Sequence, residues 1–400
     1  MIWFIGTLFV VYQLMLQNGF GAISENVTKD LSLTAVGTGV LSGSFLITYS
    51  LMQLPAGLAL DRFNPRWLMA AGALICAIAA WFFGQADSLG SAIAIRSAMG
   101  VGAAVAFPGA GLLARRWINP AQFALAMGLI DCAFGIGAVL GDSGFNHLLT
   151  VMDWRGVLVL LSITGLVVSV LIAAGVRSAP PGWSSEEEKP VPLREALAVM
   201  LRNRQVLLGM IFYAGTCGTL FGFGGLWDIK LQQAFGYDPV KAVDLNSWIF
   251  VGLAISAPIV GLISDSWGRR KPLLVIGSLG STIACAVVLF GPVFSDLATI
   301  LVLLIQGIFL GVNVLVFATV CESLPKGYGA SAIGLVNAAG CLCGGLLQMI
   351  PPMMMGSDRW QPLEVYQQTL TIFLVVLVLA TVAALLMHDT RPGWDHKPGT

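Results

Sequence analysis

"GLALDRFNPR" occupies residues 57–66 and "GLISDSWGRR" occupies residues 261–270. Each phrase consists of a glycine, three mostly apolar residues, an aspartate and then basic charge. Each also follows directly on a long stretch that is almost free of charge. Because the same phrase recurs at corresponding places in the two halves of the chain, we interpret it as the mark of an internal duplication.

The composition indicates which solvent surrounds the fold. Of the 400 residues, 57% are hydrophobic and 10% are charged, whereas an ordinary soluble domain has about 25% charged residues. So few charges cannot cover a surface that faces water. Lys and Arg total 21 and Asp and Glu total 21, so the net charge does not point to nucleic acid and we expect no such partner. The chain is predicted to lie in a lipid bilayer.

Twelve apolar windows follow one another along the chain. A helix of about 20 residues, rising about 1.5 Å per residue, crosses a hydrocarbon layer of about 30 Å. Lipid offers no partner to backbone groups, and the windows are too long and too evenly apolar for barrel strands. We therefore expect an all-α integral membrane protein with twelve transmembrane helices. The windows are residues 2–22, 35–57, 67–86, 89–113, 121–141, 156–176, 206–227, 243–264, 272–292, 297–320, 330–352 and 367–387.

Basic residues indicate the orientation in the membrane. If the N-terminus is cytoplasmic, most Lys and Arg residues fall in cytoplasmic segments, and Arg96 lies within a helix. This distribution predicts both termini in the cytoplasm and an inner-membrane location. The basic residues left for the outside loops are Lys29, Arg155, Lys230, Lys241 and Arg359.

One long polar segment divides the first six windows from the last six. Its later part sets Leu193, Leu197, Met200 and Leu201 on one side of a short helix, which predicts a helix lying on the membrane surface. A segment that only tethers the two halves is the alternative. The expected units are an N-terminal set of six helices (1–178), a cytoplasmic linker with this amphipathic segment (179–204), a C-terminal set of six helices (205–388) and a cytoplasmic tail (389–400).

Cysteine and histidine give no indication of a catalytic or metal site. The seven cysteines lie within or at the ends of apolar windows, without a spacing typical of metal ligands, so we expect free thiols, no metal and no cofactor. His147, His388 and His396 fall at window edges or in the tail and cannot form a site together. We expect no catalytic residues and a protein that is not an enzyme.

The two loop phrases resemble the signature of the major facilitator superfamily, roughly Gly-x-x-x-Asp-Arg-x-Gly-Arg-Arg after helix 2, with an echo after helix 8. The resemblance implies two pseudo-symmetric six-helix bundles. The first copy has Asn64 and Pro65 where the family has Gly-Arg, and the second has Ser266 where it has Arg. The matching residues are Gly57, Asp61, Arg62 and Arg66, then Gly261, Asp265, Gly268, Arg269 and Arg270.

For this motif, the resemblance implies a conformational latch. Asp61 would meet the N-terminal end of a helix in the other half, where the helix dipole favours an anion. Arg62 and Arg66 would complete the network, which must break when the cytoplasmic side opens. Surface charges that only set the topology are the alternative, and both roles can hold together.

A second motif and the positions of polar residues suggest a central cavity. "RSAMGVGAAVAFP", beginning at Arg96, is similar to the family's Arg-x-x-x-Gly-x-Gly-Ala pattern in helix 4. In this family helices 1, 4, 7 and 10 line the cavity. Hydrogen bonding between helices without ligand contact is the alternative for each polar residue. The candidates for contact with substrate are Tyr12, Gln13, Gln17, Arg96, Tyr213, Gln306 and Asn313.

Two charges are predicted inside the membrane, Arg96 in helix 4 and Asp131 in helix 5. Each costs about 2.5–3.5 kcal/mol if it faces lipid, so both should face the protein interior. We expect Asp131 to carry a coupling proton that Arg96 displaces when it approaches. A static ion pair that holds helix 4 to helix 5 is the alternative.

The resulting functional prediction is a secondary transporter working by alternating access, a proton symporter for a monoanionic or polar neutral organic solute. Its expected partners are the solute, a proton or other coupling ion, and the bilayer, and it should work as a monomer. Family efflux proteins usually carry a Gly-Pro pair in helix 5, and residues 135–144 have no proline. Proton-coupled efflux and a transporter-like solute receptor stay open as alternatives.

Overall fold

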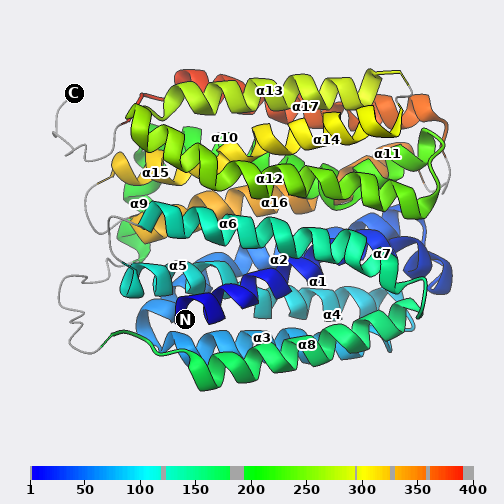
Figure 1. The fold of residues 1–400 in the computed structure, drawn as a ribbon, viewed down its shortest axis with the longest axis horizontal. Coiled ribbons are helices and arrows are strands. Elements are labelled where there is room, and N and C mark those ends of the chain that lie inside the picture. Colours follow the sequence, from blue (N-terminus) through cyan, green and yellow to red (C-terminus); the bar gives the residue numbers. More distant parts are fainter. Residues whose placement is uncertain are drawn as a thin grey trace.

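The structure is a computed structural model that describes residues 2–118, 123–180, 193–292, 295–324, 329–356 and 361–390. All regular structure in these residues is helical, and twelve helical spans are long and apolar enough to cross a membrane. The prediction of twelve spanning helices is confirmed. Figure 1 shows the spans lying side by side along the long axis of the molecule.

Each half of the chain supplies six spans, some built from two consecutive helices. The N-terminal half contains α1 (Ile2–Asp30), α2 (Ala35–Arg62), α3 (Pro65–Phe83), α4 (Leu89–Ala103), α5 (Ala106–Trp117), α6 (Phe123–Val139), α7 (Phe145–Leu148) and α8 (Trp154–Gly175). The C-terminal half contains α10 (Arg204–Gly222), α11 (Asp228–Ala234), α12 (Pro239–Trp267), α13 (Lys271–Phe290), α14 (Asp296–Leu310), α15 (Leu315–Glu322), α16 (Gly329–Met355) and α17 (Leu363–Leu386).

Three spans contain an irregular turn where the chain changes its helical pitch. A π-helical turn at Leu140–Gly144 joins α6 to α7, and another at Phe223–Trp227 joins α10 to α11. A 3₁₀ turn at Gly311–Val314 joins α14 to α15. Since π-helical turns occur frequently at functional sites, the two in α6–α7 and α10–α11 direct attention to the residues beside them.

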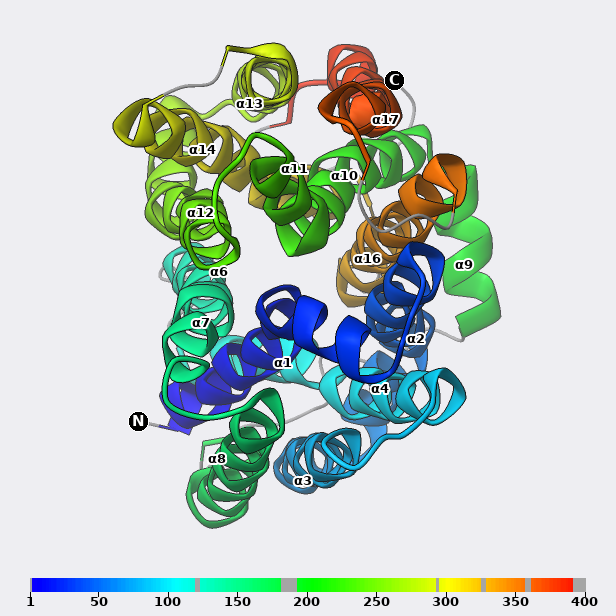
Figure 2. The ribbon, with the colours of Figure 1, turned by 90° about the vertical axis from the view of Figure 1, so that its right-hand side faces the viewer.

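The two halves meet along two seams. The α6–α12 seam and the α2–α16 seam lie on opposite sides of the molecule, with the N-terminal half below and the C-terminal half above in Figure 2. We call the end that carries the two loop phrases the motif end. The opposite end, where α1 meets α2 and α11 meets α12, is the far end, on the right in Figure 1.

Glycine allows close backbone approach along both seams. A Cβ atom added to Gly135 of α6 would lie 2.7 Å from the Cβ of Ala254 on α12. One added to Gly43 of α2 would lie 2.5 Å from the carbonyl oxygen of Gly345 on α16. Neither position can accept a larger side chain without moving one half away from the other.

The predicted amphipathic segment forms α9 (Leu193–Arg202), but residues 181–192 of the predicted linker lie outside the described residues. Met200 is fully buried, whereas Leu201 is 49% exposed. The Asn203 side chain caps the following helix by accepting from the backbone N–H groups of Gln205 and Val206. The apolar side of α9 therefore contacts the C-terminal half, and its position on a membrane surface stays a prediction.

Candidate transport site

The second loop phrase forms a charged cluster around Arg270, which follows α12. Its guanidinium donates to Asp265 Oδ1 at 2.7 Å, to Ser264 Oγ at 2.7 Å and to Glu322 Oε1 at 3.1 Å. Burial alone would lower the pKa of Arg270, but its bond to Asp265 and the charge of Glu322 outweigh burial and raise it. Glu322 ends α15, so the cluster fastens three helices of the C-terminal half at the motif end. The sequence analysis did not include Glu322.

Arg269 and Gly268 have separate roles in the same phrase. Gly268 ends α12 with a φ of 67°, a left-handed conformation that favours glycine. Arg269 Nε donates to Asp389 at 2.7 Å, and Asp389 Oδ1 also accepts from the backbone N–H groups of Arg270 and Lys271 at 3.0 Å. Burial alone would raise the pKa of Asp389, but these hydrogen bonds outweigh it and lower that pKa. Asp389 thereby ties the segment after α17 to the start of α13.

The first loop phrase has a different local structure. Asn64 caps α3 by accepting from the backbone N–H of Arg66 at 3.0 Å, and Pro65 occupies the first helical position. Asparagine and proline suit these two positions, which explains the departure from the family pattern. Arg66 lies 4.8 Å from the Trp67 ring, and Arg62 is exposed. The side chain of Asp61 lies outside the described residues, so its predicted contact with the other half stays a prediction.

Gly57 and Gly261, which begin the two phrases, share one property. A Cβ atom added at either position would meet no atom within 4 Å. No close approach between helices requires glycine there in this structure.

Arg96 on α4 is a buried cation without an acidic partner among the described residues. Its side chain is 2% exposed, and it donates to the carbonyl oxygens of Leu16 at 3.4 Å and Gln17 at 3.5 Å. Its guanidinium carbon lies 4.3 Å from the centre of the Phe20 ring. A cation–π contact and two carbonyl bonds orient this charge but do not neutralise it.

Asp131 on α6 lies apart from Arg96, and the two form no ion pair in this structure. It is half-buried on the α6–α12 side of the interior, with no hydrogen bond to any described residue. Its charge is close enough to act on Tyr213 and Cys217 of α10 in the other half. The structure therefore places Asp131 opposite α10 rather than beside α4.

A layer of polar side chains from four helices lies between the two halves. The Tyr213 hydroxyl of α10 donates to Asn337 Oδ1 of α16 at 3.4 Å. Tyr49 of α2 interacts with Gln13 of α1 and with Asn337. The candidates predicted from the sequence were confined to helices 1, 4, 7 and 10, so Tyr49 and Asn337 were missed, although polar residues at helical spacing on helices 2 and 11 were a usable signal.

Several buried amides have no hydrogen-bond partner within the described part of the chain. Among them are both amide atoms of Gln17, both amide atoms of Gln306, and Gln13 Oε1. Gln306 is fully buried, and Asn313 on the same span is 7% exposed. Buried polar groups are rarely left unpaired in proteins, so these atoms indicate places for water or for a polar ligand.

Tyr12 faces away from the other polar candidates. A Cβ atom added to Gly165 of α8 would collide with the Tyr12 hydroxyl, so the tyrosine ring lies against α8. Its ring also stacks on Phe9 with centroids 6.5 Å apart. The structure does not bring Tyr12 together with Gln13 or Gln17.

Two buried aspartates, Asp142 and Asp228, are functional candidates that the sequence analysis missed. Both are fully buried and each lies beside a π-helical turn at the far end. The apolar windows predicted for these spans ended at residues 141 and 227, one residue before each acid. The sequence did contain a signal for these two residues. Each is a single acidic residue that directly follows a glycine-rich helical stretch and has no basic residue one turn later.

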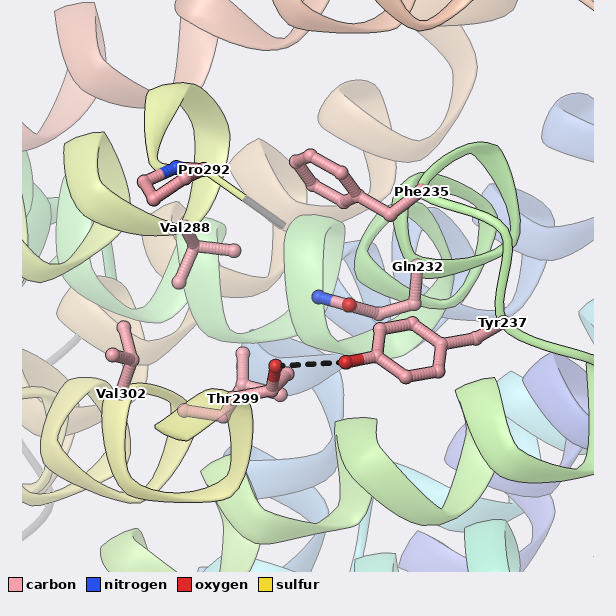
Figure 3. A pocket seen from close by; sticks show the side chains of 8 residues that line it. Gln232, Phe235, Tyr237, Val288, Pro292, Thr299 and Val302 are labelled. Carbon is pink, nitrogen blue, oxygen red and sulfur yellow. Dashed lines mark hydrogen bonds between the residues drawn. The ribbon is translucent and has the colours of Figure 1, made fainter. Parts of the chain in front are cut away.

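Two hollows lie at the far end. The larger is a groove of about 210 Å³ between the halves, lined in part by Glu25 of α1, Asn146 of α7, Lys230 of α11 and Val243 of α12. The smaller, of about 20 Å³, is shown in Figure 3, where the Tyr237 hydroxyl and Thr299 Oγ1 lie 3.1 Å apart. The smaller has room for about one water molecule, whereas the groove is large enough for several.

The arrangement of two six-span halves with buried polar side chains between them defines a polytopic membrane transporter. The comparisons identify its family: residues 3–347 match the Major Facilitator Superfamily, and the chain belongs to it. The resemblance seen in the two loop phrases and in helix 4 is thereby confirmed.

Curated relatives within the family are transporters of small solutes. The "Probable L-galactonate transporter" of Escherichia coli (strain K12) is 26% identical over 36% of this chain and 32% of that protein. The "Probable galactarate/D-glucarate transporter GudP" of Bacillus subtilis (strain 168) is 23% identical over 79% of this chain and 76% of that protein. The first match thus spans about a third of its relative, whereas the second extends over most of both chains.

Among solved structures, the "Crystal structure of D-xylose-proton symporter" has a TM-score of 0.76. It covers 98% of this chain and 97% of that chain at 15% identity. At this identity the likeness confirms the fold alone. The family match and the relatives make the protein a secondary transporter, and its twelve spans make it an integral multi-pass membrane protein.

Proposed function

We propose that the protein carries a small hydroxylated organic acid with one carboxylate across the membrane by alternating access, in symport with protons. The observation that carries this proposal is the isolated charge of Arg96. It is buried, bonds backbone carbonyls and stacks on Phe20, but has no ion-pair partner among the residues the structure describes. A substrate carboxylate supplies the missing counter-charge.

The neighbouring amides suit a hydroxylated substrate. Gln17 supplies one of the two α1 carbonyl oxygens that bind Arg96, and both of its side-chain amide atoms are free to bond a ligand. An amide donates and accepts, as a sugar hydroxyl does. The relatives whose printed names specify L-galactonate and galactarate or D-glucarate support a hydroxylated acid as the substrate. Of these solutes L-galactonate has one carboxylate, as proposed here, whereas galactarate and D-glucarate have two. The residues proposed to line the path are Gln13, Gln17, Arg96, Tyr213, Gln306 and Asn313.

Asp131 is the proposed proton carrier of the central layer. It lies on the α6–α12 side, facing Tyr213 across the halves, where opening of the seam exposes it to one side of the membrane and then the other. Proton binding at Asp131 and anion binding at Arg96 then take place on different spans. Coupling arises because both require the same rearrangement of the two halves.

Orientation and assembly complete the proposal. The motif end, which carries the basic residues of the two phrases, faces the cytoplasm, and the membrane is the inner membrane of a bacterium. The solute then enters from the far end. One chain contains both halves and all the residues proposed for the path, so a monomer is sufficient.

Uptake by purified protein in proteoliposomes tests this function. With an inside-alkaline pH gradient and labelled L-galactonate, galactarate and D-glucarate, we expect uptake of L-galactonate, the acid with one carboxylate, in preference to the two dicarboxylates. Arg96→Gln should abolish uptake, whereas Asp131→Asn should abolish gradient-driven uptake and leave exchange. Arg202→Gln, at an exposed position on α9, is the control. Full uptake by Arg96→Gln would exclude the proposed anion site.

A further inference from the structure

Asp142 and Asp228, here called the acid pair, lie buried at the far end, one from each half. Asp142 is in the π-helical turn after α6, and Asp228 begins α11 directly after the π-helical turn of the other half. Both residues are 0% exposed, and the charge of Asp228 is close enough to act on Asp142. Two neighbouring buried carboxylates cannot both be ionised without compensation.

Hydrogen bonds join Asp142 to α12 and Asp228 to its own helix, α11. Asn246 Nδ2 donates to Asp142 Oδ2 at 2.7 Å and to the carbonyl oxygen of Gly224 at 2.7 Å. Gln232 Nε2 donates to Asp228 Oδ1 at 2.9 Å. Asn246 therefore bridges the π-helical turn of α10–α11 and that of α6–α7, and through them the two halves.

Each carboxyl of the site accepts one amide hydrogen bond, but three further oxygen atoms have no donor among the described residues. Asp142 Oδ1, Asp228 Oδ2 and Asn246 Oδ1 are buried and have no partner in the part of the chain that is described. Asn246 is itself 0% exposed, and its bond to Asp142 directs its amide group at the acid pair. All three unpaired atoms are acceptors when the carboxyls are ionised. A proton bound to a carboxyl provides an O–H donor for one of these unpaired acceptors.

A metal ion fits this site less well than a proton. Hard cations take about six or more oxygen ligands, and the acid pair and Asn246 offer three unpaired oxygens. Among the described residues, no group of three or more His, Cys, Asp or Glu side chains is arranged to hold a metal.

Neighbouring ionisable groups do not neutralise the acid pair. They are Glu25 and Lys29 of α1, His147 of α7, Lys230 of α11, Asp244 of α12 and Cys285 of α13. Asp244 adds negative charge near Asp142. Lys230 is two residues after Asp228, about 200° around the helix, and its charge acts on Glu25 and Lys29 instead.

The far-end groove provides access to the site. Asn146, Ile229 and Val243 line this groove, and each lies within four residues of Asp142, Asp228 or Asn246 on the same span. Gln232, which bonds Asp228, lines the water-sized cavity on the C-terminal side. A small rearrangement of the far end therefore brings water to the acid pair.

We propose that the acid pair and Asn246 form a proton-binding site that controls closure of the far end. With a proton bound, the two carboxyls can be buried against each other and the halves close. Without the proton, the two carboxylates repel each other and need water around them, which holds the far end open. The role of this site in coupling rests on the proposed symport, but proton binding itself requires no substrate.

Infrared spectroscopy of the purified protein in lipid, without substrate, tests the site. We expect a carboxylic-acid C=O band at neutral pH that disappears as the pH rises. The band should weaken in Asp142→Asn and in Asp228→Asn. Asp131→Asn identifies any contribution from that residue, and Asp87→Asn, at an exposed position of the same end, is the control. An unchanged band in both acid-pair variants, or loss of the wild-type band on adding Na⁺ at constant pH, would overturn the proposal.

Thermal unfolding across the same pH series gives a second readout. A folded protein that retains a proton which the unfolded chain releases becomes less stable as the pH rises. We therefore expect the Tm of the wild type to fall with rising pH and to fall less in Asp142→Asn, because an amide supplies the donor without a proton. Equal pH dependence in both proteins would refute proton binding at the acid pair. A failure of solute uptake alone would leave both measurements intact and would count against the transport function instead.

Discussion

The two ends of the α6–α12 seam are held in different ways. Toward the motif end the contacts are steric: Gly128 and Gly135 of α6 lie against the backbone and small side chains of α12. At the far end the contacts are polar: the Ser143 and Ser247 hydroxyls lie 2.8 Å apart, and Asn146 Nδ2 donates to the carbonyl oxygen of Val240 at 2.7 Å.

This difference has a consequence for alternating access. Apolar contacts between glycine and small residues can separate without leaving a buried polar group unpaired. The far-end hydrogen bonds can separate only if water replaces the lost partners, because an unpaired buried group costs about 1–3 kcal/mol. Opening of the far end is therefore coupled to hydration, and opening of the motif end is governed by how closely the helices fit.

The largest effect is expected from breaking the steric fit. A Cβ atom added to Gly135 already lies 2.7 Å from the Cβ of Ala254 and 2.9 Å from the carbonyl oxygen of Phe250. The larger side chain of Gly135→Leu would therefore collide with both. Overpacking of this kind costs about 1–3 kcal/mol, so the closed seam should become at least about fivefold less populated. We expect uptake in proteoliposomes to fall by a similar factor for Gly135→Leu.

Gly261→Leu is the matched control for this prediction. Gly261 lies on α12, and a Cβ atom there meets nothing within 4 Å. Uptake by Gly261→Leu should stay near the wild-type rate. If both variants lose the same fraction of uptake, close approach at the seam is not what matters.

The sequence was sufficient to predict the spanning helices but not their contacts. Apolar windows of the length of a bilayer locate helices because lipid leaves the backbone no other way to satisfy its hydrogen bonds. The same windows ended at residues 141 and 227, whereas the spans run to Leu148 and Ala234. The π-helical turns extend each span past its last apolar residue, and hydropathy carries no signal for such a turn.

The direction of single side chains was equally hard to predict. Tyr12 and Gln13 are neighbours in the sequence, yet Tyr12 packs on Gly165 inside its own half while Gln13 lies near Tyr49. Helical spacing gives the angle between two side chains around the helix axis, but it does not show which side of the helix faces the other half. That depends on how α1 packs against α8, a contact between residues far apart in the chain.

An intermediate effect is expected from the ion pairs of the motif end, which lie within the C-terminal half rather than across the seam. Asp389→Asn removes the charge that accepts from Arg269 and from two backbone N–H groups. Arg269 is 50% exposed, so screening limits the loss to about 1 kcal/mol. We expect a lower Tm at pH 7 in a melting experiment with detergent-solubilised protein.

The pH dependence of this effect has a definite sign. Because the pKa of Asp389 is lowered in the folded protein, its contribution is fully present above the unfolded value of about 4 and is lost as the pH falls through the folded value. The Tm difference between the wild type and Asp389→Asn should therefore shrink under acid. A difference that stays constant down to low pH would mean that the carboxylate charge is not involved.

The smallest effect is expected at the hydroxyl pair of the far end. Ser143→Ala leaves Ser247 able to bond the Val243 carbonyl oxygen at 3.2 Å, so one neutral bond worth about 0.5–1.5 kcal/mol is lost without stranding its partner. The far end should open slightly more easily, and a double-mutant cycle with Ser247→Ala should give a coupling energy within that range. Thr164→Ala, which removes a bond within α8, is the control. Coupling near zero would show that this pair does not hold the seam and that the polar character of the far end depends on Asn146 and Asn246.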